Sequence, residues 1–324
     1  MTVLVAENEN LELSGPTAVT IGKFDGVHVG HRELIRATVA EAREIGGSSV
    51  VLTFWPHPLT ILRPDVELRL LTSLEDRLDL IGGEAPDFIR VVPFDDQFAR
   101  QTADDFLSGL RNSLGMSVLV TGREGRMGRE RHAGVEEMQV IGMRIGFELK
   151  VVKPVVIGQR VSSIMVRDLL KLPDIERATE ALGRLPSYAG QVARGDRRGR
   201  ELGFPTANLE IDKDLSLPAN GVYSGRALLS TEGSTELRSA VINLGVRPTF
   251  GDNKRLLEAH LLDFDGDIYG EWIRVYFEEF LRPERRFEGV EALKSQIATD
   301  TADARLAAAR SVPPNLYVPW SDRG

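Results

Sequence analysis

The sequence contains no cysteine among its 324 residues, which excludes a disulfide framework, a thiolate zinc site and a cysteine nucleophile. No apolar stretch approaches the roughly 18–20 residues that a membrane-spanning helix needs. The formal net charge of −8 lacks the basic footprint that nucleic-acid-binding proteins usually carry. The first residues, MTVLVAENENLE, hold acids where a signal peptide holds bases. We therefore expect a cytoplasmic protein whose partners are neither nucleic acid nor membrane.

The composition is that of a globular protein, with 42% hydrophobic and 27% charged residues. The length is comfortable for two domains, each with its own core. There is no internal repeat and no low-complexity tract. The sequence does not set the oligomeric state, so assembly into an oligomer stays open.

The first half alternates strand-like and helix-like segments. The strand-like runs are Thr17–Ile21, Ser49–Phe54, Phe88–Phe94 and Met116–Val120. Helical spacing covers residues 34–45 and 74–81, and Thr102 with Asp105 forms a capping-box variant that opens a helix through Leu114. This alternation predicts an α/β domain, a doubly wound parallel sheet covered on both faces. Such sheets bind ligands beyond the carboxyl ends of their strands, at a topological switch point.

The pattern changes near Gly183, where the helical periods stop. Short β-rich segments follow: Tyr188–Ala193, Gly221–Leu229, Ala240–Leu244, Leu256–Phe264 and Ile273–Phe280. They predict an antiparallel barrel or sandwich, closed by a charged helix over Val290–Ala309. We therefore predict two domains, 1–183 and 184–324.

A glycine- and arginine-rich segment opens the second domain. Its glycines let backbone amides approach phosphate oxygens, and its arginines add charge. It is not a P-loop, because no Gly-Lys-Ser/Thr follows, and Gly22-Lys23 is excluded likewise because Phe24 follows it. A turn without a ligand is the alternative interpretation.

Polar residues follow on two β-like runs. Thr206 and Asn208 are two residues apart, so on a strand they share one face, and their oxygens suit Mg²⁺. Glu258 lies inside another β-like run, where a carboxylate could act as general base for a hydroxyl nucleophile. The alternatives are a Pro-Thr turn with an Asn cap and a salt-bridged surface glutamate.

Four motifs together resemble the riboflavin kinase module. They are GQVARGDRRGRELGFPTANL at 190–209, GVYSG at 221–225, NLGVRPTF at 243–250 and EAHLLDFDGDIYG at 258–270. The resemblance implies a six-stranded closed barrel in which Glu258 orients or deprotonates the riboflavin 5′-hydroxyl and Thr206 and Asn208 face magnesium. It also implies an ATP-binding set of Gly195, Gly199, Arg200, Gly203 and Pro205, with Asn243 and Arg247 on the flavin side.

In the first domain, GKFDGVHVGH at 22–31 follows the first strand and precedes the first helix. His28 and His31 are three apart at a helix start, so both can face a bound phosphate, and Gly30 leaves room for a nucleotide. A metal site of these two histidines with His57 is a weaker alternative, since no carboxylate has zincin spacing. A purely structural role is the other alternative.

This segment, with TFWPHP at 53–58 and RVSSIMVR at 160–167, resembles the FMN adenylyltransferase module of bifunctional bacterial FAD synthetases. The resemblance implies attack of the FMN phosphate on the ATP α-phosphorus, with release of pyrophosphate. It makes His28, His31 and Arg167 catalytic. The implied ATP-binding residues are Gly22, Phe24, Asp25, Gly26, Gly30, Arg160, Ser162 and Ser163, and the implied flavin-binding residues are Pro56, His57 and Glu124.

Four features depart from the pattern of that module. Ile164 stands at a usual threonine, and the Gly122–Gly128 stretch, GREGRMG, lacks both usual aromatics, with Glu124 at the usual amide or shorter acid. Lys23 replaces a common asparagine and Trp55 a common acid. A flexible basic loop is the alternative interpretation of the Gly122–Gly128 stretch.

Three functions therefore compete. The first is a bifunctional enzyme that converts riboflavin to FMN and FMN to FAD, with ATP as co-substrate and Mg²⁺ as cofactor. The second is a riboflavin kinase joined to a weakened or substrate-altered nucleotidyltransferase domain. The third is a flavin- or nucleotide-binding regulatory protein without turnover, which the intact Thr206, Asn208 and Glu258 disfavour.

Overall fold

The computed structural model describes residues 2–5, 13, 15–194, 199, 202–231, 234–246 and 255–310. The chain forms two compact units, Met1–Ser163 and Ile164–Gly324, and each is described by itself. The predicted domain boundary near residue 184 stays a prediction.

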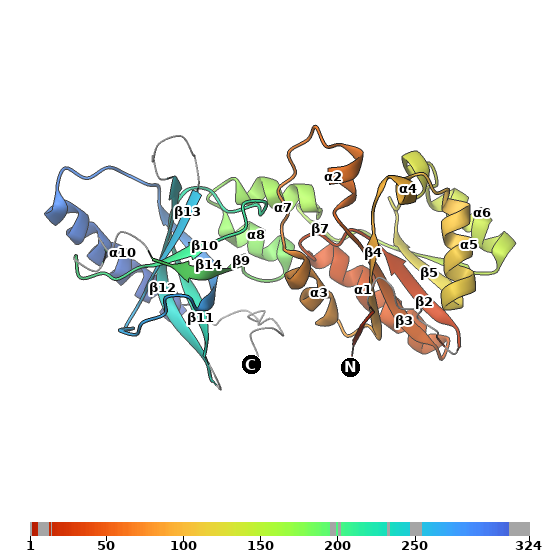
Figure 1. The fold of residues 1–324 in the computed structure, drawn as a ribbon, viewed down its shortest axis with the longest axis horizontal. Helices are drawn as coiled ribbons and strands as arrows, with labels where there is room; N and C mark the ends of the chain where they lie inside the picture. Colours follow the sequence, from red (N-terminus) through yellow and green to blue (C-terminus); the bar gives the residue numbers. More distant parts are fainter. Residues whose placement is uncertain are drawn as a thin grey trace. The chain divides into compact units, whose positions relative to one another are not determined.

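The first unit is an α/β domain (Figure 1). Its strands are β1 (Val3–Val5), β2 (Thr17–Ile21), β3 (Ser48–Trp55), β4 (Phe88–Pro93), β5 (Met116–Gly122), β6 (Glu148–Val152), β7 (Val156–Ile157) and β8 (Gln159–Arg160). Its helices are α1 (Val29–Glu44), α2 (Pro58–Leu62), α3 (Leu74–Gly82), α4 (Asp96–Ala99), α5 (Ala103–Leu114), the 3₁₀ turn η1 (Arg129–Arg131) and α6 (Val135–Ile145).

Six strands form one parallel sheet in the order β1-β4-β3-β2-β5-β6. The chain runs from β2 outward through β3 to β4 and then returns to place β5 on the other side of β2. The strand order therefore reverses between β2 and β5, which makes their carboxyl ends the topological switch point. This confirms the predicted doubly wound sheet.

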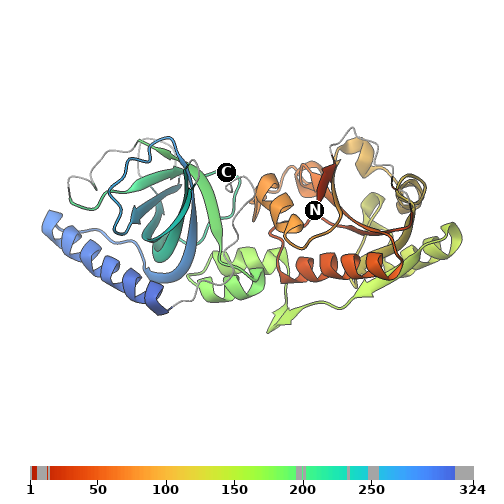
Figure 2. The ribbon, with the colours of Figure 1, turned by 90° about the horizontal axis from the view of Figure 1, so that it is seen from below.

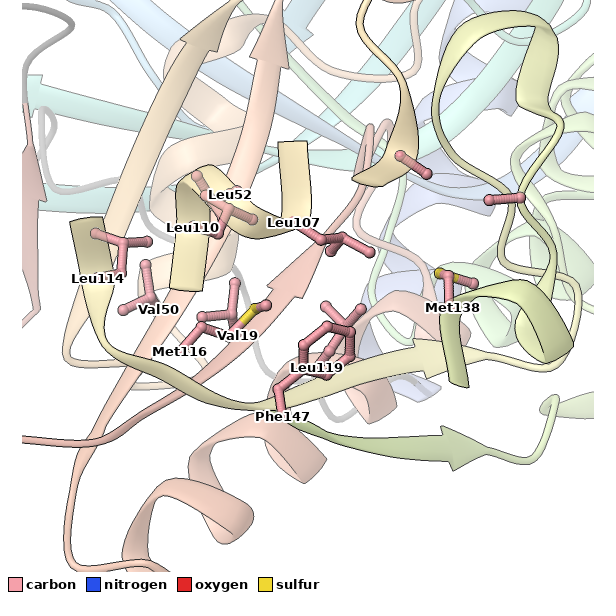
Figure 3. Close-up of a cluster of buried hydrophobic side chains, with 12 residues drawn as sticks. Val19, Val50, Leu52, Leu107, Leu110, Leu114, Met116, Leu119, Met138 and Phe147 are labelled. Carbon is pink, nitrogen blue, oxygen red and sulfur yellow. The ribbon is translucent and has the colours of Figure 1, made fainter. Parts of the chain in front are cut away.

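Alternating side chains of β2 bury the two faces of the sheet against different helices. Ala18 packs in a cluster with Ala42 of α1, whereas Val19 packs with Leu107 of α5. Figure 3 shows the second cluster, where residues of β2, β3 and β5 meet α5 and Met138 of α6. Burial on both faces explains why these strands read as continuous apolar runs.

Helix α1 begins earlier than its apolar spacing predicts, at Val29 rather than Leu34. His28 caps this end, since its side chain accepts a hydrogen bond from the backbone N–H of His31. The capping-box variant is confirmed at α5, where Thr102 Oγ1 accepts from Asp105 N at 3.1 Å and donates to the Asp105 carboxylate at 2.7 Å.

The second unit is built around a closed antiparallel barrel (Figure 1). Its strands are β9 (Ser187–Ala193), β10 (Ala207–Glu210), β11 (Gly221–Thr231), β12 (Ser234–Val246), β13 (Arg255–Leu261) and β14 (Trp272–Arg282). Its helices are α8 (Ile175–Leu182) and α10 (Val290–Arg310), and α7 (Ser163–Leu170) begins at the last residue of the first unit.

The barrel closes in the order β10-β13-β12-β11-β14-β9, with β9 also paired to β10. Of the two predicted architectures, a barrel and a sandwich, the structure confirms the barrel. Val241 faces outward, because it packs with Ala304 of α10, and Figure 2 shows α10 running beside the barrel. Ile242 and its cross-strand partner Ala259 are buried on the opposite, inner face.

Strand β13 ends at Leu261, three residues before the predicted end at Phe264. Asp263 has φ +56°, a left-handed conformation that ends the ladder in a turn. Leu262 lies just beyond the strand and packs in the cluster with Val241, the outward-facing residue that is paired with His260.

None of the helices in the described part of the chain combines the length and the apolar character that a membrane crossing requires.

Candidate functional site

The segments singled out in the first unit follow neighbouring strands at one edge of its sheet. The Gly22–His31 loop follows β2, the Pro56-His57 pair follows β3, and the Gly122–Gly128 stretch follows β5. Because all six strands are parallel, these segments gather beyond the carboxyl ends around the switch point.

The Gly22–His31 loop has a constrained backbone. Phe24 and Val27 have φ values of +48° and +37°, and both side chains are fully buried in one apolar cluster. Gly26 has φ +83°, and a Cβ there would lie 2.6 Å from the Leu71 side chain. Left-handed residues cost about 1–3 kcal/mol each and persist only where packing enforces them, often at functional sites.

Asp25 joins this loop to two other segments. Its buried carboxylate accepts from Leu71 N at 2.9 Å, and its carbonyl accepts from Ser163 Oγ at 2.9 Å. The Ser163 hydroxyl therefore donates its hydrogen bond to the Gly22–His31 loop, and both were predicted to bind the ATP phosphates. Asp25 has a structural role in this arrangement.

The two histidines lie together at the start of α1. Their rings stack with centroids 3.7 Å apart, and His31 also meets the Phe24 ring edge-on at 5.3 Å. Because His28 Nδ1 accepts from His31 N at 3.3 Å, a neutral His28 carries its proton on Nε2. Gly30 lies against this ring, since a Cβ would come within 3.3 Å of His28 Nδ1 and Cε1. The arrangement offers imidazole donors at a helix N-terminus, which attracts anions.

Arg77 of α3 is a buried cation beneath this edge that the sequence interpretation missed. It is 0% exposed, its Nη1 donates to Phe54 O at 3.2 Å, and its guanidinium lies 5.7 Å from the centre of the Trp55 ring. Burial lowers its pKa, while the carboxylates of Asp25 and Glu75 oppose that shift. The burial of Arg77 could have been predicted from its position three residues after Leu74, on the apolar face of α3.

His57 caps the short helix α2, with Nδ1 accepting from Leu59 N at 3.2 Å, and it is buried. It is thus held at the carboxyl end of β3 directly after the exposed Pro56. Among the described residues there is no group of three or more His, Cys, Asp or Glu side chains that could hold a metal. The three-histidine metal alternative therefore has no support here.

Glu124 and Arg160 form an ion pair. The structure thus brings together a residue predicted for the flavin side and one predicted for the ATP phosphates. Ser162 lies two residues after Arg160, and Ile164 is 71% exposed and offers no donor. Arg167 lies on α7 in the second unit, and its role beside His28 stays a prediction.

Four phenylalanines form an aromatic cluster at the same edge of the sheet. Phe54 is the penultimate residue of β3, Phe94 follows β4, Phe98 lies on α4 and Phe106 on α5. Neighbouring ring centroids are 5.2–5.6 Å apart in tilted or edge-on pairs. The sequence analysis noted only that the usual aromatics are missing from the Gly122–Gly128 stretch. It did not identify this cluster, because the four rings come from separate segments of the chain.

In the barrel, three polar residues form a row across neighbouring strands. Glu258 of β13 is directly opposite Asn208 of β10 on one side and Asn243 of β12 on the other. Asn243 Nδ2 donates to the Glu258 carboxylate at 3.2 Å. Opposed residues share a face, and the alternate residues are buried inside the barrel, so this row lies on the outer face.

Thr206 directly precedes β10, beside this row. His260 Nδ1 lies 2.7 Å from the Pro205 carbonyl, and its ring meets Phe204 edge-on. A Cβ on Gly199 would lie 3.1 Å from Thr206 Oγ1, so Gly199 lies against Thr206. Gly203 has φ +87°, a turn that favours glycine.

Gly195, Arg200 and Arg247, which the sequence assigned to ATP and flavin, lie outside the described residues. Within the described part, the structure joins Gly199, Thr206, Asn208, Glu258 and Asn243 into one region. The register places Asn208 and Glu258, which the sequence analysis marked on separate segments, directly opposite one another.

Two family models match the chain. One described as "FAD synthetase" matches residues 11–165, and one described as "Riboflavin kinase" matches residues 182–308. The curated relatives include proteins named bifunctional riboflavin kinase/FMN adenylyltransferase. The one from Pseudomonas fluorescens is 37% identical over 295 residues, covering 90% of this chain and 93% of its own length. The one from Escherichia coli K12 is 36% identical over 289 residues, covering 89% and 91%.

Among solved structures, a Streptococcus pneumoniae protein described as a macrolide-efflux protein superposes with a TM-score of 0.84. It is 27% identical, and the match covers 93% of this chain and 98% of that one. Neither a weakened nucleotidyltransferase nor a non-catalytic binding protein is favoured by these matches. The chain belongs to the family of bifunctional riboflavin kinase/FMN adenylyltransferases.

Proposed function

We propose that the two units catalyse consecutive steps of flavin cofactor synthesis with separate sets of residues. The barrel phosphorylates riboflavin at the outer-face row of Asn208, Glu258 and Asn243. The α/β unit adenylylates the resulting FMN at the switch point. The observation that carries the proposal is the cross-strand row, which holds a carboxylate between two amides, with Gly199 against the adjoining Thr206.

In the kinase step, Glu258 accepts the proton of the riboflavin 5′-hydroxyl. The hydroxyl oxygen bonds to the γ-phosphorus of ATP, the bond to the β,γ-bridging oxygen breaks, and ADP leaves. The hydrogen bond from Asn243 fixes the orientation of the carboxylate. Positioning and charge neutralisation dominate such phosphoryl transfers, so the step needs no covalent intermediate.

The side chains around Thr206 fit Mg²⁺. A hydroxyl oxygen and an amide oxygen are hard donors, and Mg²⁺ usually takes one or two protein ligands together with substrate phosphates and water. Thr206 and Asn208 would hold the ion, which would neutralise phosphate charge when bound.

In the adenylyl step, a phosphate oxygen of FMN bonds to the α-phosphorus of ATP. The bond to pyrophosphate breaks, and pyrophosphate leaves. His28 Nε2 and the stacked His31 donate hydrogen bonds to the charge that develops on the transferred and leaving phosphates. The backbone amides at the start of α1 add to this stabilisation.

The aromatic cluster of Phe54, Phe94, Phe98 and Phe106 supports flavin binding in the α/β unit. An isoalloxazine ring needs apolar or aromatic surface, and the stretch after β5 supplies none of the usual rings. Because both steps consume ATP, we also propose a cytoplasmic location, with small molecules as the only substrates.

Two variants test whether the two reactions use separate sets of residues. Glu258→Gln removes the base while keeping the shape, and it should lower FMN formation from riboflavin by about 10²–10⁴-fold. Conversion of supplied FMN to FAD should be unchanged in this variant. His28→Ala should show the reverse pattern. Loss of both activities in either variant would contradict two separate sites.

A further inference from the structure

The ion pair between Glu124 and Arg160 connects two turns at the mouth of the switch point. Glu124 lies in the turn after β5, and Arg160 ends the small β7–β8 hairpin. The two side chains are 64% and 48% exposed, so a ligand arriving from solvent can reach both.

Backbone geometry fixes both partners in place. The Glu124 turn is closed by a hydrogen bond from Gly125 N to Gly122 O at 2.8 Å, and a Cβ on Gly125 would lie 2.1 Å from Thr121 Oγ1. The hairpin turns at Gly158, which has φ +65°. Two glycine turns therefore shape the backbone that carries Glu124 and Arg160, which are 36 positions apart in sequence.

We propose that Glu124 is an affinity-setting residue that occupies the Arg160 guanidinium in competition with the ATP phosphates. This inference rests on the proposed phosphate-binding role of Arg160. A guanidinium binds carboxylate and phosphate through the same fork of N–H donors, so one fork cannot serve both fully. The Glu124–Arg160 pair must open before the triphosphate gains Arg160, and the negative charge of Glu124 then remains beside the phosphates.

The direction of the effect is opposite to that expected of a binding residue. Removing the carboxylate in Glu124→Gln frees Arg160 and removes the repulsion, so ATP should bind more tightly. An exposed ion pair of this kind corresponds to about a 1.5- to 5-fold change in an equilibrium constant. The KM for ATP in FMN adenylylation should therefore fall by about that factor in the variant.

Glu130 offers a matched control. It lies in the same segment after β5 and carries the same charge, and within the described residues it makes no ion pair. Glu130→Gln removes one negative charge from this segment without freeing Arg160, so its KM for ATP should stay at the wild-type value. The reverse variant, Arg160→Gln, should raise the KM for ATP.

The experiment measures the KM for ATP in the conversion of supplied FMN to FAD for the full chain, these three variants and the double variant Glu124→Gln/Arg160→Gln. The proposal expects a lower KM for Glu124→Gln at low ionic strength and a difference that shrinks with added salt. It also expects Glu124→Gln to lower the KM by a smaller factor in the Arg160→Gln background than in the wild-type protein, because only the repulsion is then removed. An unchanged or higher KM for Glu124→Gln, with a raised KM for Arg160→Gln, overturns the competition and leaves the proposed function standing. An unchanged KM for Arg160→Gln overturns the phosphate role of Arg160 itself.

Discussion

Substituting Gly30 by alanine should separate the stability of the α/β unit from its adenylyltransferase activity. Gly30 lies in the first turn of α1 with an ordinary backbone conformation, so alanine is compatible with the helix. Its Cβ would nevertheless lie 3.3 Å from His28 Nδ1 and Cε1, and 3.8 Å from Val161 O. The His28 ring must therefore shift by a few tenths of an ångström.

That shift disturbs the two contacts that hold the histidine pair, namely the hydrogen bond from His31 N to His28 and the stack of the two rings. His28 Nδ1 moves relative to the His31 backbone N–H, now 3.3 Å away, and the ring moves in a stack whose centroids are 3.7 Å apart. Misplacement of a reacting group by about 1 Å can cost about 100-fold in rate. We expect the smaller shift here to lower the kcat for FAD formation by about 10-fold. Replacing glycine by alanine in a helix stabilises it by up to about 1 kcal/mol, so the free energy of unfolding should not fall.

Gly109→Ala in α5 is the control, because no atom lies within 4 Å of the Cβ it would add. It should raise the free energy of unfolding by about 0.5–1 kcal/mol and leave both activities unchanged. Urea denaturation and the conversion of supplied FMN to FAD are measured for both variants, with FMN formation from riboflavin as an internal reference. Undiminished FAD formation by Gly30→Ala would refute the role given to the position of His28.

Three further predictions concern the barrel. Asp300→Asn should lower the free energy of unfolding of the barrel unit by about 3 kcal/mol, because the buried Asp300 carboxylate accepts paired hydrogen bonds from Arg282. Asp263→Asn removes the exposed ion pair with Arg305, and in the same urea experiment it should lower the free energy of unfolding by less than about 1 kcal/mol. Burial raises the pKa of Tyr223 to about 12, so its contribution to stability is complete below pH 10 and is lost as the pH rises from 10 to about 12. At pH 11 the tyrosinate absorbance should therefore show less ionisation in the native protein than in the unfolded chain. A Tyr223→Phe variant that leaves this difference unchanged would contradict the assignment. Chelation of Mg²⁺ should abolish FMN formation and its return should restore it, whereas the Thr206→Val variant should need more Mg²⁺; an equal requirement in both proteins would remove Thr206 from the metal site.

Much of the fold follows from local sequence signals. The Thr17–Ile21 strand and the capped helix after Thr102 agree with β2 and α5, because apolar runs and side-chain caps act over a few neighbouring residues. The closure of the barrel could not be read in the same way, since it depends on the pairing of β9 with both β10 and β14. The motifs predicted it only through a family resemblance.

The candidate sites show the same division between local and long-range information. The motifs marked Glu258 and Asn208, and the antiparallel register of β10 and β13 places them directly opposite one another. The burial of Arg77 and the pairing of Glu124 with Arg160 depend on contacts between segments 23 and 36 positions apart. No spacing rule within one helix or strand reaches that far, so these features needed the structure.

Our central claim is that this single chain converts riboflavin to FAD in two separate ATP-dependent steps. The most direct measurement follows flavins and phosphates with time after riboflavin, ATP and Mg²⁺ are added to the wild-type protein. We predict that FMN accumulates first with one ADP for each FMN, and that FAD follows with one pyrophosphate for each FAD. FMN that never proceeds to FAD would contradict the second step, and the absence of FMN would contradict the whole account.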